Sequence, residues 1–377
     1  IDSQATTFIT GLILFSFGTG PILGFATTLM LGIVTSLFTG ILVSRLIMEK
    51  LLAKGQVINF IAEGKKGLFH GANYNILGKR KYMYIFSSLF IIIGIVSLFT
   101  NGLNYGVDFK GGRTYTIQLP IDKEINSEDV RKGLNEVFAQ SSPEVKTVSG
   151  FTNRYKVATK EKIEINSVEA DQEVAGMVYD GLKTFMGSVT KEDFVGSDKY
   201  IIESRKVGPT IVDDIKWGAL QAVFWSILAI GVYLLIRFKR WYYSMGAALA
   251  LFHDVFFIIT LYTVLWKVMP FSLEVDQNFI AAILTIIGYS VNDTVVVFDR
   301  LREYLRENSE EDAEVVINRA MNSTLSRTII TVLTVLLTSV ILLFFGGEAL
   351  RGFSFSLTMG LIIGTYSSVF IASALVL

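Results

Sequence analysis

Residues 277–298, QNFIAAILTIIGYSVNDTVVVF, are long and apolar enough to cross a bilayer as a helix, which needs about 20 mostly apolar residues. The same stretch carries a carboxylate, Asp293, beside the side-chain amide of Asn292 and the hydroxyls of Thr294 and Ser290. An ionisable residue inside a membrane span costs about 2.5–3.5 kcal/mol. Asp293 is therefore a candidate functional residue by default.

Seven further apolar runs accompany this one, so we expect eight spans and a polytopic α-helical membrane protein. The eight runs are 4–17, 22–47, 82–100, 215–236, 243–265, 277–298, 328–345 and 353–377. Lys and Arg residues gather in the connections 45–81, 237–240 and 299–327. These connections share one side because even numbers of spans separate them, and the positive-inside rule places that side in the cytoplasm.

The connection at residues 101–210 is the only large one on the opposite side. Its strands are predicted at 113–119, 145–150, 155–159 and 200–205, and its helices at 127–139, with Ser127 as N-cap, and at 168–186. This order favours a ferredoxin-like α+β domain. The other predicted domains are two spans at 1–48, a cytoplasmic linker at 49–81 with an interfacial helix within 53–77, a span at 82–100 and five spans at 211–377.

Composition excludes several classes of protein. Lys+Arg and Asp+Glu are both 34 in 377 residues, so no net positive charge favours nucleic acid. Cysteine is absent and only two histidines are present, His70 and His253, so we expect no disulfides and no metal site. The outer domain offers no nucleophile–base pair. We therefore expect no enzyme and no cofactor other than a coupling ion.

An internal repeat relates the two ends of the chain at a constant offset of 328 residues. Thr10, Ile13, Leu14, Phe17, Gly18, Gly24, Phe25, Leu29 and Gly32 match Thr338, Ile341, Leu342, Phe345, Gly346, Gly352, Phe353, Leu357 and Gly360. Each copy is predicted to be two spans joined by a tight glycine turn. Transporters with such repeats hold their substrate and ion sites between the halves. The first copy begins at a point that the second copy reaches only after Arg327, so one of the two repeats is represented only by its last part. We therefore expect a further stretch of roughly 300 residues, with its own outer domain, before residue 1.

Arg327 stands at the start of the seventh predicted span, whereas Asp293 nears the end of the sixth. Because these spans run in opposite directions, the two residues are expected at similar depth near the cytoplasmic boundary, where they can pair. Burial raises the pKa of a carboxyl, whereas a neighbouring arginine lowers it. The balance of the two effects can leave the carboxyl able to exchange a proton near neutral pH. The alternatives are a static ion pair and an Arg327 that snorkels to the surface.

Two further sets of residues are candidates. Asp254 follows His253 near the middle of the fifth predicted span; it is either a second ion-translocating carboxyl or half of a structural hydrogen-bonded pair. Residues 106–113, GVDFKGGR, follow the third span and lack the P-loop pattern. Their glycines permit a bend, which is either a tight turn or a hinge that couples membrane and outer domain. The hinge candidates are Gly106, Asp108, Gly111, Gly112 and Arg113.

Several motifs resemble those of the SecD/SecF family of bacterial protein-export membrane proteins, within the RND superfamily. In the SecF-like region, about 74–377, they are GVDFKGGR at 106–113, VGP at 207–209, FHDV at 252–255, GYSVNDTVVVFDR at 288–300 and LSRT at 325–328. Residues 15–20, 24–26 and 39–45 are similar to the last two membrane helices of SecD. The order of these parts resembles a natural SecD–SecF fusion.

The resemblance implies an RND-type fold in the bacterial inner membrane, with residues 101–210 in the periplasm. It also implies an accessory subunit of the Sec translocase that uses the proton gradient, or in some members sodium, to promote export of unfolded polypeptides. The implied partners are the SecYEG channel, the SecA motor and a YajC-like subunit. The family's intramembrane aspartate and arginine match Asp293 and Arg327, whereas the larger outer domain and partner aspartate of SecD match nothing here. An exporter of small molecules or lipids and a non-transporting scaffold of the translocon remain as alternatives.

Overall fold

The computed structural model describes residues 2–18, 21–56, 73–121, 125–138, 141, 143–148, 151–165 and 167–376. The chain divides into two compact units. The first, the helical unit, comprises Ile1–Gly102, Gly218–Val264 and Asn278–Leu377. The second, the α/β unit, comprises Leu103–Trp217 and Leu265–Gln277.

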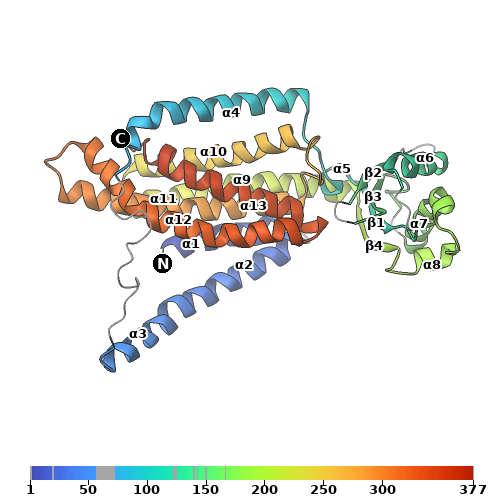
Figure 1. The fold of residues 1–377 in the computed structure, drawn as a ribbon, viewed down its shortest axis with the longest axis horizontal. Helices are drawn as coiled ribbons and strands as arrows, with labels where there is room; N and C mark the ends of the chain where they lie inside the picture. The colour runs from blue at the N-terminus through green and yellow to red at the C-terminus, as the bar shows by residue number, and fades with distance from the viewer. Residues whose placement is uncertain are drawn as a thin grey trace. The chain divides into compact units, whose positions relative to one another are not determined.

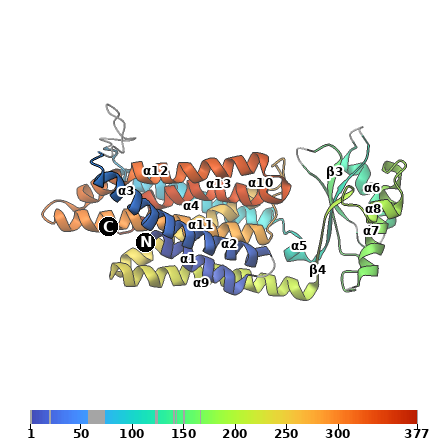
Figure 2. The same ribbon diagram turned by 90° about the horizontal axis from the view of Figure 1, so that it is seen from below.

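The helical unit is a bundle in which the long helices lie side by side (Figures 1 and 2). Its helices are α1 (Asp2–Phe17), α2 (Pro21–Leu37), α3 (Ser44–Ala53), α4 (Arg80–Thr100), α12 (Ala313–Phe345), α13 (Glu348–Ser367) and most of α9 (Pro209–Phe238), α10 (Trp241–Leu265) and α11 (Gln277–Glu307). Short segments of π-helix, η1 (Phe38–Val43) and η4 (Ser368–Ala372), follow α2 and α13, and a 3₁₀ turn, η2 (Leu77–Lys79), precedes α4.

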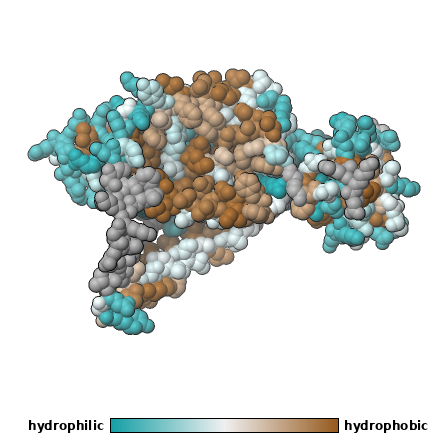
Figure 3. Space-filling view, viewed as in Figure 1, coloured by the Kyte–Doolittle hydropathy of each residue, from teal (hydrophilic) through white to brown (hydrophobic). Residues whose placement is uncertain are grey.

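Seven helical segments of the described chain are long and apolar enough to cross a membrane. The apolar helix at the eighth predicted position, 4–17, is shorter, so the count of eight spans stays a prediction. Apolar side chains cover much of the outer surface of the bundle (Figure 3), as a lipid-facing surface requires. In the apolar window of α11, by contrast, 83% of residues are buried, so the helix that carries Asp293 forms the centre of the bundle.

The predicted repeat is visible in the helix boundaries and in matching hydrogen bonds. The amide of Gly18 donates to the carbonyl of Leu14 at 2.7 Å, and the amide of Gly346 donates to that of Leu342 at 2.8 Å. These bonds end α1 and α12 at equivalent positions, and η1 and η4 follow at nearly the same offset. Residues 19 and 20 of the first predicted turn lie outside the described residues.

The α/β unit contains α5 (Val107–Lys110), β1 (Gly112–Gln118), α6 (Ser127–Val137), β2 (Glu144–Thr147), β3 (Arg154–Thr159), α7 (Val168–Leu182), a 3₁₀ turn η3 (Lys183–Phe185), α8 (Lys191–Val195) and β4 (Ile201–Val207). The strands form an antiparallel sheet in the order β2-β3-β1-β4. The helices α6 and α7 cover one face of the sheet (Figure 2), and the apolar core lies between them and the strands.

Several boundaries differ from the sequence predictions. The N-cap of α6 is Asn126 rather than Ser127, because the Asn126 side chain accepts a hydrogen bond from the Glu128 amide at 3.1 Å. The short helix α8 was not predicted, and the strand predicted at 145–150 ends at Thr147. In the predicted linker at 49–81, α3 continues to Ala53. Residues 57–72, which make up most of the 53–77 stretch where an interfacial helix was predicted, lie outside the described residues.

Candidate functional site

Asp293 is buried in the helical unit, with 7% of its surface exposed. A cavity of about 10 Å³ lies beside it, lined by Tyr289, Ser290 and Asn292 of α11 and by residues of α12 and α13. This volume is about that of one water-sized sphere. The Oδ1 atom of Asn292 is buried and has no hydrogen-bond partner among the described residues, and such orphaned polar atoms commonly mark an ordered water or ion.

Arg327 lies on α12 and is exposed in the described chain. Its charge is near enough to act on the Asp293 carboxyl. Among the ion pairs of the described residues, however, none joins the two side chains within 4 Å, so the direct pair stays a prediction.

Asp254 is completely buried on α10 and is held by hydroxyl groups from two other helices. Its Oδ2 atom accepts hydrogen bonds from Ser290 Oγ at 2.6 Å and from Ser367 Oγ at 2.9 Å. Its Oδ1 atom lies 3.1 Å from His253 Nδ1. Ser290 therefore contacts Asp254 directly and also lines the cavity beside Asp293, which brings the two predicted carboxylates into one site.

Thr294 belongs to the same cluster. Its Oγ1 atom lies 2.8 Å from Ser368 Oγ, and both hydroxyls donate to the Ser290 carbonyl, at 3.1 and 3.2 Å. Ser368 is the first residue of η4, directly after Ser367. The junction of α13 with the π-helical segment thus presents two consecutive serines to this polar cluster, and π-bulges are frequent at functional sites.

The segment that follows α4 packs against the loop that precedes α11, within the α/β unit. The Gly106 amide donates to the Val275 carbonyl at 3.0 Å, and the Val275 amide donates to the Asn104 carbonyl at 2.8 Å. The buried Asp108 Oδ2 atom accepts from the Gln277 amide at 3.1 Å. Gln277 is the first residue of α11, so Asp108 supplies a cap and a favourable charge to that helix end.

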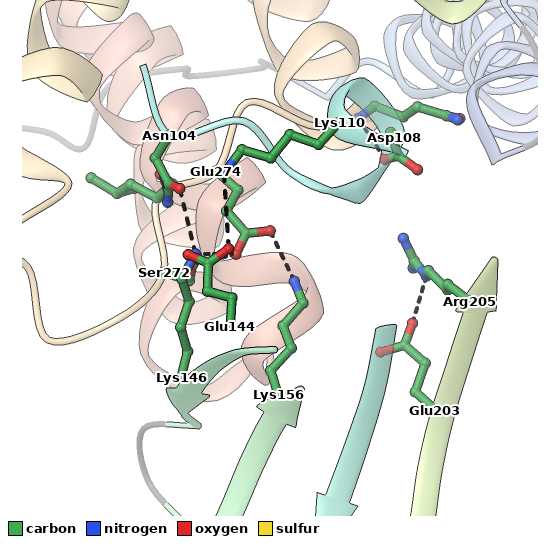
Figure 4. Close-up of polar contacts among 12 residues, drawn as sticks. Asn104, Asp108, Lys110, Glu144, Lys146, Lys156, Glu203, Arg205, Ser272 and Glu274 are labelled. Atoms are coloured by element: carbon green, nitrogen blue, oxygen red, sulfur yellow. Dashed lines mark hydrogen bonds and ion pairs between the residues drawn. The ribbon is translucent and has the colours of Figure 1, made fainter. Parts of the chain in front are cut away.

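Glu274 lies in the same loop and forms ion pairs with two lysines of the sheet (Figure 4). Lys146 of β2 and Lys156 of β3 each place Nζ 3.0 Å from its carboxylate, and Ser272 donates to it at 2.8 Å. Burial alone would raise the pKa of Glu274, but the charges of the lysines and the bond from Ser272 lower this pKa to about 2. Burial alone would lower the pKa of Lys156, but the charge of Glu274 and its hydrogen bond raise this pKa above its ordinary value.

The two adjacent glycines form a tight turn into β1. Gly111 and Gly112 have φ of +70° and +141°, and a Cβ on Gly112 would lie 2.9 Å from the Thr159 carbonyl oxygen. Arg113, by contrast, is buried inside the α/β unit, where its guanidinium bonds Asp171 at 2.5 Å and the Glu161 carbonyl at 2.6 Å. The structure thus places Arg113 as an anchor between β1 and α7, while movement at the glycines stays a prediction.

Two family models match the chain at these places. The C-terminal model of the protein export membrane proteins SecD/SecF matches residues 188–377, and the SecD/SecF GG motif matches residues 96–119. The chain belongs to the SecD/SecF family. The GG-motif match contains Asp108, Gly111, Gly112 and Arg113.

The relatives are translocase subunits by name. The chain is 43% identical to protein translocase subunit SecF of Rhodothermus marinus, over 82% of this chain and 94% of that protein. It is 34% identical to protein translocase subunit SecDF of Bacillus subtilis, over 99% of this chain and 49% of that protein. The chain thus spans about half the length of its SecDF relatives.

Solved structures show the same similarity. The crystal structure of SecDF from Thermus thermophilus, described as a translocon-associated membrane protein, matches all of this chain and 47% of its own, with a TM-score of 0.82 and 30% identity. A SecDF crystal structure described as the super-membrane-facing form matches with a TM-score of 0.65 and 28% identity.

For this SecD/SecF chain, sequence reasoning missed the residues that come from distant elements. Ser367 and Ser368 lie in a run that reads only as membrane helix, and Glu274 lies in a short connection. Their only signal in the sequence is polarity at the edge of, or within, an apolar run. Among the described residues, no group of three or more His, Asp or Glu is placed to hold a metal ion.

Proposed function

We propose that the chain is part of an accessory subunit of the Sec translocase that promotes export of unfolded polypeptides across the bacterial inner membrane. The names of its SecF and SecDF relatives support this role. The proposed partners are the SecYEG channel, SecA and a YajC-like subunit, and the proposed coupling ion is a proton or sodium. No enzymatic step is part of this proposal.

The proposal includes an RND-type arrangement of spans, with residues 101–210 as a periplasmic ferredoxin-like domain. The strand order β2-β3-β1-β4 and the element order β1-α6-β2-β3-α7-β4, with η3 and the short α8 inserted between α7 and β4, support the fold of this domain. The lysines and arginines on the opposite connections support its side of the membrane.

The observation that carries the proposal is that α11 begins at the last residue of the 265–277 segment of the α/β unit and continues through the helical unit. It begins at Gln277, whose amide is bound by Asp108 of the GG motif, and it carries the buried Asp293 farther on. At 1.5 Å per residue these points are about 24 Å apart along one helix. A change at Asp293 that shifts or rotates α11 therefore acts directly on the segment that leads into the outer domain.

Energetically the coupling is feasible. One elementary charge that crosses a potential of about 100 mV gains about 2.3 kcal/mol. That energy changes a two-state equilibrium by a factor of tens. In this mechanism, uptake of an ion at Asp293 alters the packing of α11, and the outer domain moves with the start of that helix while it holds the polypeptide.

The test measures proton entry into vesicles that contain the full-length protein, with an unfolded polypeptide on the outer side. We expect Asp293→Asn to abolish the flux and to slow export. The matched control is Asp299→Asn, since Asp299 lies on the same helix but pairs with Arg237 at 3.4 Å and is partly exposed. We expect this control to keep both activities.

Equal flux in wild type and Asp293→Asn, with export intact, would leave Asp293 a structural residue and favour the scaffold. Transport of a dye or lipid without any effect of the polypeptide would favour the small-molecule exporter.

A further inference from the structure

A continuous row of hydrogen bonds leads from Asp254 to the start of α4. His253 Nδ1 lies 3.1 Å from Asp254 Oδ1, and His253 Nε2 lies 3.1 Å from Ser87 Oγ. Ser87 Oγ lies 2.9 Å from the Tyr366 hydroxyl, which lies 2.9 Å from the Met83 carbonyl oxygen. The row crosses from α10 to α4 and α13, and its inner members are buried.

The row ends near the charged end of α4. Met83 lies three residues after Arg80, the first residue of α4, in the sequence Lys79-Arg80-Lys81. The positive-inside rule places this end of the helix in the cytoplasm. Tyr366 and Met83 are only partly buried, so the row leads from the centre of the bundle toward its cytoplasmic surface.

At its other end the row reaches the neighbourhood of Asp293. Asp254 Oδ2 accepts from Ser290 at 2.6 Å, and Ser290 shares with Asp293 the lining of the cavity of about 10 Å³. A single water in that cavity would connect the Ser290 hydroxyl to the Asp293 carboxyl. Asp254 therefore lies between the Asp293 cavity and the row that leads to Tyr366.

The donors and acceptors of this row allow two arrangements of hydrogen atoms between Asp254 and Tyr366. In the first, Tyr366 donates to Ser87, Ser87 donates to His253 Nε2, and His253 Nδ1 donates to an ionised Asp254. In the second, a protonated Asp254 donates to His253 Nδ1, His253 Nε2 donates to Ser87, Ser87 donates to Tyr366, and Tyr366 donates to the Met83 carbonyl. Hydroxyls and a neutral imidazole can each act as donor and acceptor, so the second arrangement satisfies every bond of the row. The first satisfies every bond except that to the Met83 carbonyl, because the one hydrogen of the Tyr366 hydroxyl is then donated to Ser87.

The two arrangements differ by one proton. When the second becomes the first, the Asp254 proton passes to Nδ1, the Nε2 proton passes to Ser87, the Ser87 proton passes to Tyr366, and the Tyr366 proton leaves to water at the Met83 end. Asp254 becomes the carboxylate, and every other group regains its neutral form. Each O–H or N–H bond that breaks is replaced by one that forms, so the step needs no other reactant.

We propose that Asp254 is a second proton-carrying carboxyl, and that His253, Ser87 and Tyr366 conduct its proton to the cytoplasmic side. This inference rests on the proposed ion coupling at Asp293 and extends it by naming the ion. The ionisable groups nearest Asp254 in this network are His253 on its own helix, Tyr366 of α13 through the row, and Asp293 of α11, whose cavity is lined by the Ser290 that binds Asp254. A row of N–H and O–H groups conducts protons and not sodium.

The sharpest variant is Tyr366→Phe, which removes one hydroxyl and keeps the ring. Its matched control is Tyr262→Phe, because the Tyr262 hydroxyl is also bound inside the helical unit, to Ser356 at 2.7 Å and the Gly352 carbonyl at 3.1 Å, but lies outside the row. In vesicles that enclose a pH-sensitive dye, we expect Tyr366→Phe to lower proton flux by about tenfold or more, as removal of a proton donor does elsewhere. We expect Tyr262→Phe to keep the wild-type flux.

Two further variants separate conduction from folding. Ser87→Ala interrupts the row at another point and should lower the flux as Tyr366→Phe does, with a wild-type unfolding midpoint. Asp254→Asn should remove a carboxylic-acid C=O band from the infrared difference spectrum between low and high pH. A flux that falls only in variants with a lower unfolding midpoint, or an unchanged infrared band in Asp254→Asn, would overturn the inference.

The outcomes distinguish this inference from the proposed function. If Asp293→Asn abolishes the flux while Tyr366→Phe and Ser87→Ala keep it, the coupling at Asp293 stands and the row is structural. If Asp293→Asn keeps the flux, the coupling itself fails. Sodium entry in place of proton entry, with Tyr366→Phe unaffected, would also contradict the inference.

Discussion

Glu274 is a buried carboxylate between two lysines, and its charge state links the stability of the α/β unit to pH. Its pKa is about 2 in the folded protein, against an ordinary value of 4.5. A carboxyl whose pKa is lowered by folding stabilises the fold above its unfolded pKa, and the contribution is lost as the pH falls through the folded pKa. The contribution of Glu274 is therefore complete above pH 4.5 and is lost as the pH falls toward about 2.

We predict that Glu274→Gln lowers the stability of β2 and β3 by about 3 kcal/mol near neutral pH. The variant should also remove most of the pH dependence of this stability below pH 4.5. Hydrogen exchange of the β2 and β3 amides across this pH range, corrected for intrinsic rates, measures both effects. The control is Glu203→Gln, because Glu203 pairs with Arg205 at 2.7 Å but both side chains are about 40% exposed, so its loss should cost less than about 1 kcal/mol. Equal losses in the two variants would refute the role assigned to Lys146 and Lys156.

At the scale of elements, the long apolar helices followed from the sequence because each span needs its own apolar run, whereas the short helix α8 did not. The strands of the α/β unit followed from alternation, and Tyr115 and Val157 of β1 and β3 pair in register within the core. The hydrogen-bond and ion-pair partners of the buried polar groups could not be predicted from the sequence. Ser367 reaches Asp254 across 113 residues, and Lys156 reaches Glu274 across 118, and no local pattern encodes such distances.

The start of α11 is a second feature of an element that the sequence does not reveal, since its cap comes from Asp108. We predict that Asp108→Ala speeds hydrogen exchange in the first turn of α11 by an amount equivalent to about 1–2 kcal/mol, whereas Asp108→Asn, which keeps an acceptor, has a smaller effect. The matched control is Asp312→Ala, because Asp312 caps α12 by accepting from the Glu314 amide at 2.9 Å. This variant should loosen α12 and leave α11 unchanged. Unchanged exchange at Gln277 in Asp108→Ala would contradict the assignment of the cap.

At the scale of the whole molecule, the two copies of the repeat meet each other. Phe25 and Phe353, which are equivalent at the offset of 328, place their ring centroids 5.7 Å apart in an edge-to-face contact. Contact between two equivalent residues is consistent with an approximate twofold relation between the copies, with the two rings at its axis. The polar cluster at Asp254 and Asp293 borders the second copy, at Ser367 and Ser368, so the proposed ion site lies where the repeat meets α10 and α11.

This arrangement predicts that a change in the charge state of Asp293 alters the α/β unit, and that α11 transmits the change. In full-length protein in vesicles, an imposed proton gradient should change hydrogen exchange in residues 265–277, where Glu274 and Val275 bind the sheet and the GG motif. Asp293→Asn should abolish that change, because the carboxyl can no longer exchange its proton, while Asp299→Asn should retain it. If the gradient alters exchange equally in both variants, α11 does not transmit the state of Asp293, and the coupling must run through another helix that enters the α/β unit, such as α9.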